Sequence, residues 1–202
     1  MLFCPEIRNI ELDDNGNLFS INRGEVIENL LDEYKISILN EQINNDINIK
    51  KFLYFNYAQP NMKLTERFNI NRNLRICIAI ELDKFNNIII DKATPCLFCS
   101  FPLIGSETFE LPFIINSPDF EPDSERQTIL LDGDDTSTET GKISDPGINK
   151  MILLKSQEIY KTLCNYICFH EIKARYLLAR GLKSPPNIIK FFDKNWYEKK
   201  TL

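Results

Sequence analysis

Several signatures of familiar protein classes are missing from this 202-residue sequence. No run approaches the roughly 20 consecutive apolar residues that span a bilayer. The opening residues, MLFCPEIRNIEL, include acidic side chains where a secretion signal has a cationic and then an apolar segment. We therefore expect a cytoplasmic chain, with the nucleus as the alternative compartment, and no membrane as a partner.

Positive charge is also scarce. The 24 Lys and Arg residues are outnumbered by 29 Asp and Glu residues, which gives a formal net charge of −5. Sequence-independent binding to nucleic acids depends on clustered cations that release phosphate counterions. The charge balance therefore argues against nucleic acid as a partner.

The only histidine, His170, limits the enzyme chemistry that the chain can carry. A Ser-His-Asp or Cys-His mechanism would have to use His170, and a structural or surface role is the simpler interpretation. Neither GxxxxGK[ST] nor GxGxxG occurs, so the chain has no recognisable phosphate-binding loop of its own. A small enzyme built on His170 is a third hypothesis, and it requires a pocket that joins His170 to a carboxylate or a thiol.

The cysteine pattern resembles a zinc site only in part. Cys96 and Cys99 have the spacing of one half-site, and Cys164, Cys168 and His170 are the only candidates for the other half. Residues three apart on a strand point to opposite faces, and the second group lies within an apolar helical stripe. We predict buried cysteines without disulfides and no metal site.

The composition that is present indicates a folded core. Hydrophobic residues make up 43% and charged residues 26%, with 14 Phe and 7 Tyr. This balance is typical of a folded protein and not of a disordered one. The length suffices for one domain with a helical appendage.

The first two thirds of the chain predict a sheet. Alternating residues from Ile7 to Leu12 and from Leu18 to Ile21 flank Asn15-Gly16, which is a strong hairpin signal. Residues 34–38, 52–57 and 74–82 predict further strands. Residues 25–34 predict a short helix, and residues 40–51 are polar enough to predict a loop.

The stretch 95–131 has the densest apolar content. Its two runs, CLFCSFPLI and FELPFII, are separated by Gly105 and predict a hairpin. The segment SPDFEPDSER then places one cation, Arg126, ahead of another apolar segment. A proline-stiffened loop could present this guanidinium group to an anionic ligand. The alternative is an ordinary salt bridge with an acidic neighbour: Glu121, Asp123 or Glu125.

The last third has a different character. Residues 132–147 are acidic and hydroxyl-rich, and they predict a flexible, solvated loop, since their aspartates lack the spacing of an EF-hand. Asp145 as N-cap and Pro146 then predict a helix, whose apolar stripe extends to Leu177 and which Gly181 caps. A shorter helix restarts near residue 184 and carries Phe191 and Phe192, and the only tryptophan, Trp196, closes the core near the end of the chain.

Together these patterns predict an α+β protein. Residues 1–131 are expected to form a mixed, mainly antiparallel sheet. Residues 132–147 are expected to form the flexible acidic loop, and residues 148–202 a helical region.

One segment resembles a known family through motifs that recur in a fixed order: Phe101-Pro102-Leu103, Leu111-Pro112-Phe113, Asn116, Phe120 and Arg126. It is similar to the region that follows the nucleotide-binding domain in sacsin-type, Hsp90-like (GHKL) ATPases. The opening residues, the FLYFNY and ICIAIEL strands and the helix around residues 149–167 also fall where that family has matching elements. Ser117 departs from the family, which usually has glycine after the asparagine.

The resemblance implies a transducer, or middle, domain with a sheet of the ribosomal S5 domain 2-like class. In that family a loop of this domain contacts the γ-phosphate of ATP held by an adjacent domain, a role that falls to Arg126 here, with Asn116 and Phe120 as motif residues. The nucleotide-binding half is missing, because Asp14-Asn15-Gly16-Asn17 is a hairpin turn and not the family's lid motif. We therefore expect no enzyme activity and no cofactor in this chain alone.

The implied partners follow from the same resemblance. ATP and Mg are expected only with an adjacent nucleotide-binding domain, of the same or a longer polypeptide, and chaperone clients are further candidates. The alternative is a non-catalytic protein–protein interaction module. In that case Phe191, Phe192 and Trp196 present an apolar surface to a partner chain.

Overall fold

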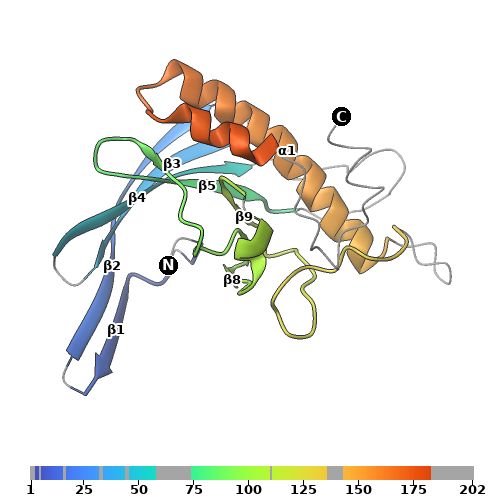
Figure 1. The fold of residues 1–202 in the computed structure, drawn as a ribbon, viewed down its shortest axis with the longest axis horizontal. Helices are drawn as coiled ribbons and strands as arrows, with labels where there is room; N and C mark the ends of the chain where they lie inside the picture. Colours follow the sequence, from blue (N-terminus) through green and yellow to red (C-terminus); the bar gives the residue numbers. More distant parts are fainter. Residues whose placement is uncertain are drawn as a thin grey trace.

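A computed structural model of the chain describes residues 3–4, 6–15, 17–31, 34–43, 46–57, 74–109, 111–135 and 143–182. Within these ranges nine strands form one sheet, and one long helix lies against a face of it (Figure 1). The predicted α+β class, with a mainly antiparallel mixed sheet, is confirmed at this level.

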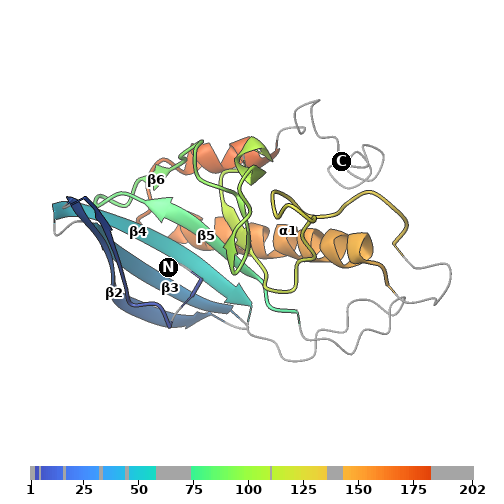
Figure 2. The same cartoon turned by 90° about the horizontal axis from the view of Figure 1, so that it is seen from below.

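The first five strands form an antiparallel meander. They are β1 (Asn9–Asp14), β2 (Asn17–Leu31), β3 (Tyr34–Ile43), β4 (Asp46–Tyr57) and β5 (Cys77–Leu82). Figure 2 shows β2 to β5 side by side, with α1 behind them. Asn15 has φ 52°, a left-handed conformation that Asn adopts at low cost. The predicted hairpin of β1 and β2 is confirmed.

Two predictions for this region were wrong. Residues 25–31 belong to β2 instead of a helix, and most of residues 40–51 belong to β3 and β4 instead of a loop. A short apolar run fits the period of a helix, 3.6 residues, as well as that of a strand, two residues. Pairing with β3 makes this segment a strand. The polar residues of β3 and β4 also fit a ladder, since Glu41 is directly opposite Lys50.

The remaining strands are short. They are β6 (Ile88–Ile89), β7 (Leu97–Cys99), β8 (Phe101–Pro102) and β9 (Ile114–Asn116), with the 3₁₀ helix η1 (Ser106–Phe109) between β8 and β9. The predicted hairpin across Gly105 was wrong, because β7 and β9 are parallel. The tight reversal lies at Ser100, with φ 63°, where β7 turns into β8. The chain then crosses through η1 before β9 begins.

Helix α1 (Asp145–Phe169) covers one face of the sheet. Its N-cap is Ser144, whose side chain accepts a hydrogen bond from the Gly147 N–H at 3.2 Å, so the prediction of Asp145 as the cap was wrong by one residue. Pro146 lies in the first turn, as predicted.

The predicted continuation of the helix to Gly181 was also wrong. Helix α1 ends at Phe169, and a separate 3₁₀ helix, η2 (Arg175–Leu182), follows a turn. In this turn the backbone of Lys173 joins the β5–β6 turn, donating to the Asn86 carbonyl at 2.8 Å and accepting from the Ile88 N–H at 3.2 Å. The guanidinium group of Arg175 donates to the Cys168 carbonyl at 3.0 Å. The Lys173 bonds satisfy two backbone groups of the β5–β6 segment, and the Arg175 bond satisfies a carbonyl of the last turn of α1.

The sheet is buried on both faces near its centre, as the alternation along β4 shows. Leu53 and Phe55 join the core beneath α1, whereas Phe52 and Tyr54 join a smaller cluster on the opposite face. That cluster also contains Phe3, whose ring lies 5.1 Å from the ring of Phe98. The helix supplies four fully buried or nearly fully buried aliphatic side chains: Ile152, Ile159, Leu163 and Ile167. In the part of the chain that the structure describes, no helix is long and apolar enough to cross a membrane.

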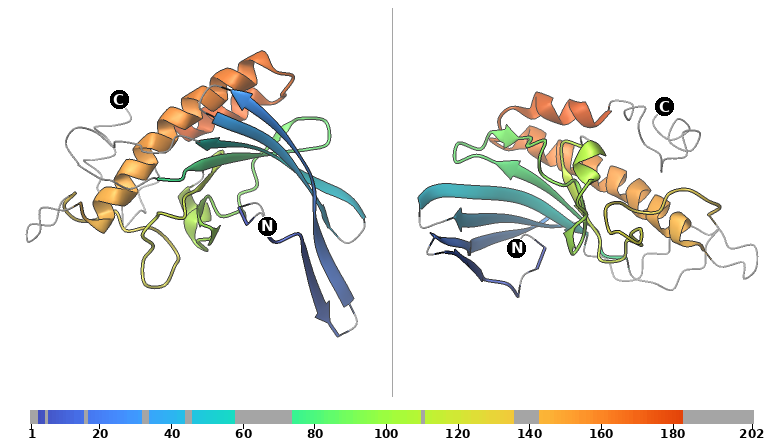
Figure 3. Two further views of the ribbon diagram at one scale, coloured as in Figure 1. Left: turned by 180° about the vertical axis from the view of Figure 1, so that it is seen from behind. Right: turned by 60° about the horizontal axis from the view of Figure 1, so that its bottom comes forward.

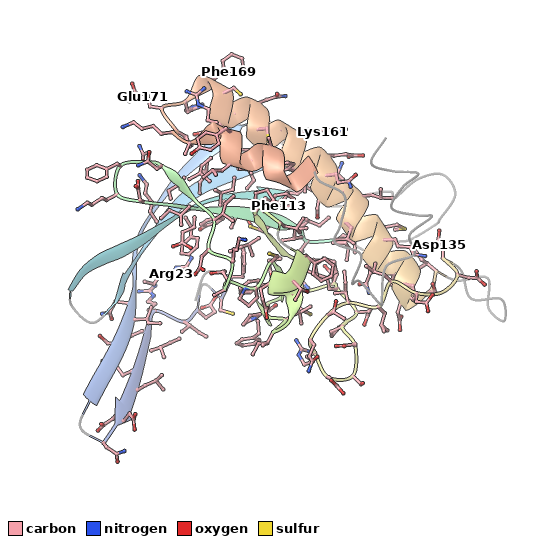
Figure 4. The ribbon with its side chains drawn as sticks, viewed as in Figure 1. Arg23, Phe113, Asp135, Lys161, Phe169 and Glu171 are labelled. Atoms are coloured by element: carbon pink, nitrogen blue, oxygen red, sulfur yellow. The ribbon has the colours of Figure 1, made fainter. Side chains whose placement is uncertain are left out.

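Leu163 tests the importance of this helix–sheet packing, since its side chain is fully buried. Leu163→Ala should lower the free energy of unfolding by about 2–5 kcal/mol, because it removes buried methyl groups and leaves a cavity. Chemical denaturation monitored by circular dichroism measures the loss. Lys161→Ala, at an exposed position on the same helix (Figure 4), should change stability by less than about 0.5 kcal/mol. Equal losses in the two variants would contradict the assignment.

Candidate functional site

Arg126 lies near the tip of a closed loop, residues 121–130. Pro122 and Ile129 form an antiparallel bridge at its base, and the Asp123 N–H donates to the Thr128 carbonyl at 3.0 Å. The carboxylate of Asp123 accepts from the Gln127 N–H at 2.8 Å and from the Thr128 N–H at 3.3 Å. These bonds fix the backbone on both sides of the tip.

The side chain of Arg126 is exposed, and its backbone has φ 54°. The Arg126 N–H donates to the Asp123 carbonyl at 3.1 Å, which holds this left-handed conformation in place. Among the described residues, no hydrogen bond or ion pair engages the guanidinium group. The predicted alternative, a salt bridge to an acidic residue of the same loop, is therefore not observed. The planar guanidinium group of Arg126 keeps its N–H donors available at the surface.

Asn149 of α1 holds the base of this loop. It is fully buried, and its side-chain oxygen accepts from the Glu121 N–H at 2.8 Å. Its side-chain nitrogen donates to the carbonyls of Glu121 and Leu130, each at 2.8 Å. One amide side chain thus joins the two ends of the loop to the helix, and neither of its polar atoms lacks a partner.

Lys150, the next residue of α1, holds the segment that follows the loop. Its side chain is 6% exposed, and its ammonium group donates to the Gly133 carbonyl at 2.9 Å and to the Asp135 carboxylate at 3.0 Å. Figure 4 shows Asp135 beside the first turns of α1. The Asp135 side chain is 52% exposed, so the pair joins a buried ammonium group to a carboxylate at the surface.

The segment predicted to be a flexible acidic loop, residues 132–147, is only partly described. Its first part is held by Lys150 and by Ser144, whose N–H donates to the Asp135 carbonyl at 3.0 Å and whose hydroxyl group donates to the Asp134 carbonyl. Residues 136–142 lie outside the described residues. The ends of this segment are therefore attached to the N-terminus of α1.

The two other motif residues are structural. Asn116, at the end of β9, is buried, and its side-chain oxygen accepts from the Ser100 N–H at 3.0 Å. This bond stabilises the turn between β7 and β8. Phe120 is 2% exposed and packs in the core beneath α1. Both residues support the platform from which the loop projects, and neither is accessible to a ligand.

A second buried polar group lies between Asn116 and the loop. Asp119 is 5% exposed, and its carboxylate accepts from the Arg75 N–H at 3.0 Å and lies 3.5 Å from the guanidinium Nε of Arg75. Ser117, fully buried, accepts a hydrogen bond from the Asp119 N–H through its hydroxyl oxygen. Ser117 thus stabilises the turn into Phe120.

An apolar side chain is exposed next to the loop. Gly105 lies against Gln127, because a Cβ atom at Gly105 would be 3.4 Å from the Gln127 carbonyl oxygen. The preceding residue, Ile104, is 70% exposed. The surface around Arg126 therefore combines a cation with an exposed aliphatic side chain, as surfaces that bind another protein domain often do.

The other candidate residues form no site. In the described residues, no group of three or more His, Cys, Asp or Glu side chains could hold a metal ion. Burial raises the pKa of the Cys96 thiol to about 11, which disfavours a reactive thiolate. His170 is exposed and its ring stacks on that of Tyr166, with the ring centroids 3.7 Å apart. This position agrees with the surface role predicted for His170.

The predicted partner-binding residues, Phe191, Phe192 and Trp196, lie outside the described residues. Asn149 and Lys150, by contrast, were missed by the sequence interpretation. The sequence did contain one signal, because Asn149 and Lys150 directly follow Ile148 at the start of the apolar stripe. Asn and Lys are rarely buried without a partner, so their burial implies hydrogen-bond partners nearby. Their partners, the ends of the loop, become apparent only in the fold.

Asn149→Ala removes three hydrogen bonds and leaves the Glu121 N–H, the Glu121 carbonyl and the Leu130 carbonyl to find new partners. We expect the free energy of unfolding to fall by about 2–4 kcal/mol, since each buried group left without a partner costs about 1–3 kcal/mol. Arg126→Ala, which removes an exposed side chain from the same loop, should cost less than about 0.5 kcal/mol. Urea denaturation of the two variants measures both values. An unchanged free energy of unfolding in Asn149→Ala would contradict the role of Asn149 in holding the loop.

Gly147→Ala tests the attachment of the acidic segment to α1. A methyl group there would lie 2.8 Å from Cγ1 of Ile143 and closer still to the Asp135 carbonyl oxygen, so the backbone must shift. We expect a loss of about 1–3 kcal/mol and a lower melting temperature. Ala at Asn165, an exposed position of the same helix, provides the control. An unchanged melting temperature for Gly147→Ala would show that the segment is not packed against Gly147.

Comparisons with models of protein families, with curated proteins and with solved structures found no match. The resemblance of residues 101–126 to a known family therefore stays a prediction from the sequence.

Proposed function

We propose that this chain is the middle, or transducer, segment of a sacsin-like, Hsp90-like chaperone ATPase, without its own nucleotide-binding domain. In this proposal Arg126 reaches the phosphates of ATP bound by an adjacent domain. The observation that carries the proposal is an exposed arginine near the tip of a loop whose two ends are joined to α1 by Asn149. A planar guanidinium group held in this way suits a phosphate ligand.

The position of the N-terminal segment supports the proposal. Phe3 packs on Phe98, and the Cys4 thiol lies 3.6 Å from the Ser100 carbonyl oxygen, so this segment meets the sheet at the β7–β8 hairpin (Figure 1). That hairpin leads directly into Gly105, which contacts Gln127 of the loop. A domain that precedes this chain in the same polypeptide would therefore be attached near the β7–β8 hairpin, whose following residues contact the loop.

The chemistry proposed for Arg126 is electrostatic. An arginine aimed at a transferring phosphoryl group stabilises the negative charge that develops on it, and a preorganised donor needs no rearrangement during the reaction. The bonds of Asp123 and Asn149 preorganise the loop backbone from which the Arg126 side chain projects. The chain alone is proposed to lack ATP hydrolysis, since ATP and Mg come with the adjacent domain. The finer fold label, ribosomal S5 domain 2-like, is part of the same proposal.

A second candidate is a non-catalytic interaction module. The described part of the chain exposes Phe169 by 87% and Tyr176 by 76%, near the end of α1 that lies away from the loop (Figure 4). Large exposed aromatic side chains are typical anchors in protein–protein contacts. In this case the substitution of Arg126 has no effect on a nucleotide reaction, whereas Phe169→Ala weakens partner binding.

Arg126→Ala should abolish most ATP turnover in an assembly with the cognate nucleotide-binding domain. We expect a loss of roughly 10³-fold in single-turnover hydrolysis, which is the lower end of the range known for arginines at such sites. Binding of ATP to the nucleotide-binding domain should be unchanged. Arg126→Lys should recover only part of the rate, because an ammonium group has the charge but not the planar fork of donors.

Lys161→Ala is the matched control, since Lys161 is an exposed cation on the outer face of α1 (Figure 4). It should leave turnover unchanged. If Arg126→Ala retains full turnover while the assembly forms normally, the proposed role of Arg126 is wrong.

A further inference from the structure

Strand β1 covers only the first part of β2. The register runs from Asp14 opposite Asn17 to Asn9 opposite Asn22, and the Arg23 N–H makes the last bond, to the Arg8 carbonyl at 2.8 Å. Beyond this point β2 pairs with β3 on one side, and no strand of the described chain lies on its other side. In the left view of Figure 3 this part of β2 is the outermost strand.

A β-bulge separates the two parts of β2. Arg23 is opposite Glu41 and Val26 is opposite Leu39, so Gly24 and Glu25 together face one residue of β3. A bulge bends its strand and increases the local twist, and glycine is common there. The bend explains why β1 pairs with only the first part of β2. It leaves an open edge, residues 26–31, which we call the β2 edge.

An open edge carries unpaired N–H and C=O groups that can pair with another extended chain. The outer edge of β1 offers few apolar contacts to an added strand, because three of its last four residues are acidic: Glu11, Asp13 and Asp14. The β2 edge contains four aliphatic residues among six and has no Lys or Pro. It is therefore the more receptive part of this side of the sheet.

We propose that the β2 edge binds an extended segment of a partner protein as an additional strand, and that this segment carries Lys or Arg among apolar residues. Glu25 in the bulge and Glu28 in the edge are acidic, and residues 24–31 include no basic residue, so charge complementarity favours a cationic strand. A second copy of this chain has the same acidic residues on this edge and offers no complementary cation there. Main-chain hydrogen bonds would supply affinity and the charges would supply selectivity. The proposal is independent of Arg126.

Synthetic nine-residue peptides of alternating Val and Lys provide the probe. A labelled peptide should bind the full chain in a fluorescence-anisotropy titration, and a Val/Glu peptide should bind at least about tenfold more weakly. A third peptide has the Val/Lys sequence with two adjacent central residues N-methylated, which removes a donor from each of its edges. It keeps the charge but should lose binding.

Hydrogen exchange locates the bound strand. Saturation with the Val/Lys peptide should slow exchange at residues 26–31 and not at β1. The double variant Glu25→Lys with Glu28→Lys should reverse the preference toward the Val/Glu peptide. Asp132→Lys with Asp134→Lys, two exposed sites with the same change in net charge, should keep the original preference.

Four results would overturn the proposal. They are equal binding of the N-methylated peptide, protection at β1 instead of the β2 edge, unchanged selectivity in the Glu25 and Glu28 variant, and a dimer of this chain that protects the same edge without peptide. The first would indicate simple charge attraction, and the last would identify a second copy as the occupant.

Discussion

The three hydrogen bonds of Asn149 are the constraint on which the candidate site depends. They connect both ends of the 121–130 loop to a helix that is itself anchored on the sheet by buried aliphatic side chains. A buried amide of this kind is costly unless every polar atom is satisfied, so its presence specifies one position of the loop relative to α1. Lys150 extends the same principle to the following segment through Gly133 and Asp135. The N-terminal turns of α1 thus organise about fifteen residues that have no regular secondary structure of their own.

The molecule has a rigid centre and an open side. Strands β4, β5 and β9 are covered on both faces, and the loop with Arg126 projects from this centre. The far side of the sheet ends in β1 and in the second part of β2, whose outer edge is unpaired in the described chain. A cation on a hydrogen-bonded loop and an open strand edge are two different kinds of surface feature, and each suits a different kind of ligand. The proposed functions assign a different kind of partner to each.

Local patterns in the sequence predicted the elements whose signals are local. The Asn15-Gly16 turn specifies the first hairpin, the alternation of residues 76–82 specifies β5, and the stripe from Ile148 specifies α1. Residues 25–31 were misassigned because their apolar spacing fits a helix and a strand equally, and only pairing with β3 decides. The parallel arrangement of β7 and β9 depends on a left-handed serine held by Asn116, a contact between residues far apart in sequence. For the site, the sequence left two interpretations of Arg126 open, a free cation on a stiff loop and a salt bridge within the loop. Asn149 was missed, since a buried polar residue is recognised only when its partners are known.

The central claim is that Arg126 is held by a rigid loop and not by a mobile one. Backbone ¹⁵N relaxation measures this directly, through the order parameters of residues 123–128 in the wild-type chain and in Asn149→Ala. We predict order parameters of about 0.85 in the wild type, as in regular secondary structure, and clearly lower order parameters in Asn149→Ala. Wild-type values below about 0.6 at Arg126 would show a flexible loop and would contradict the account.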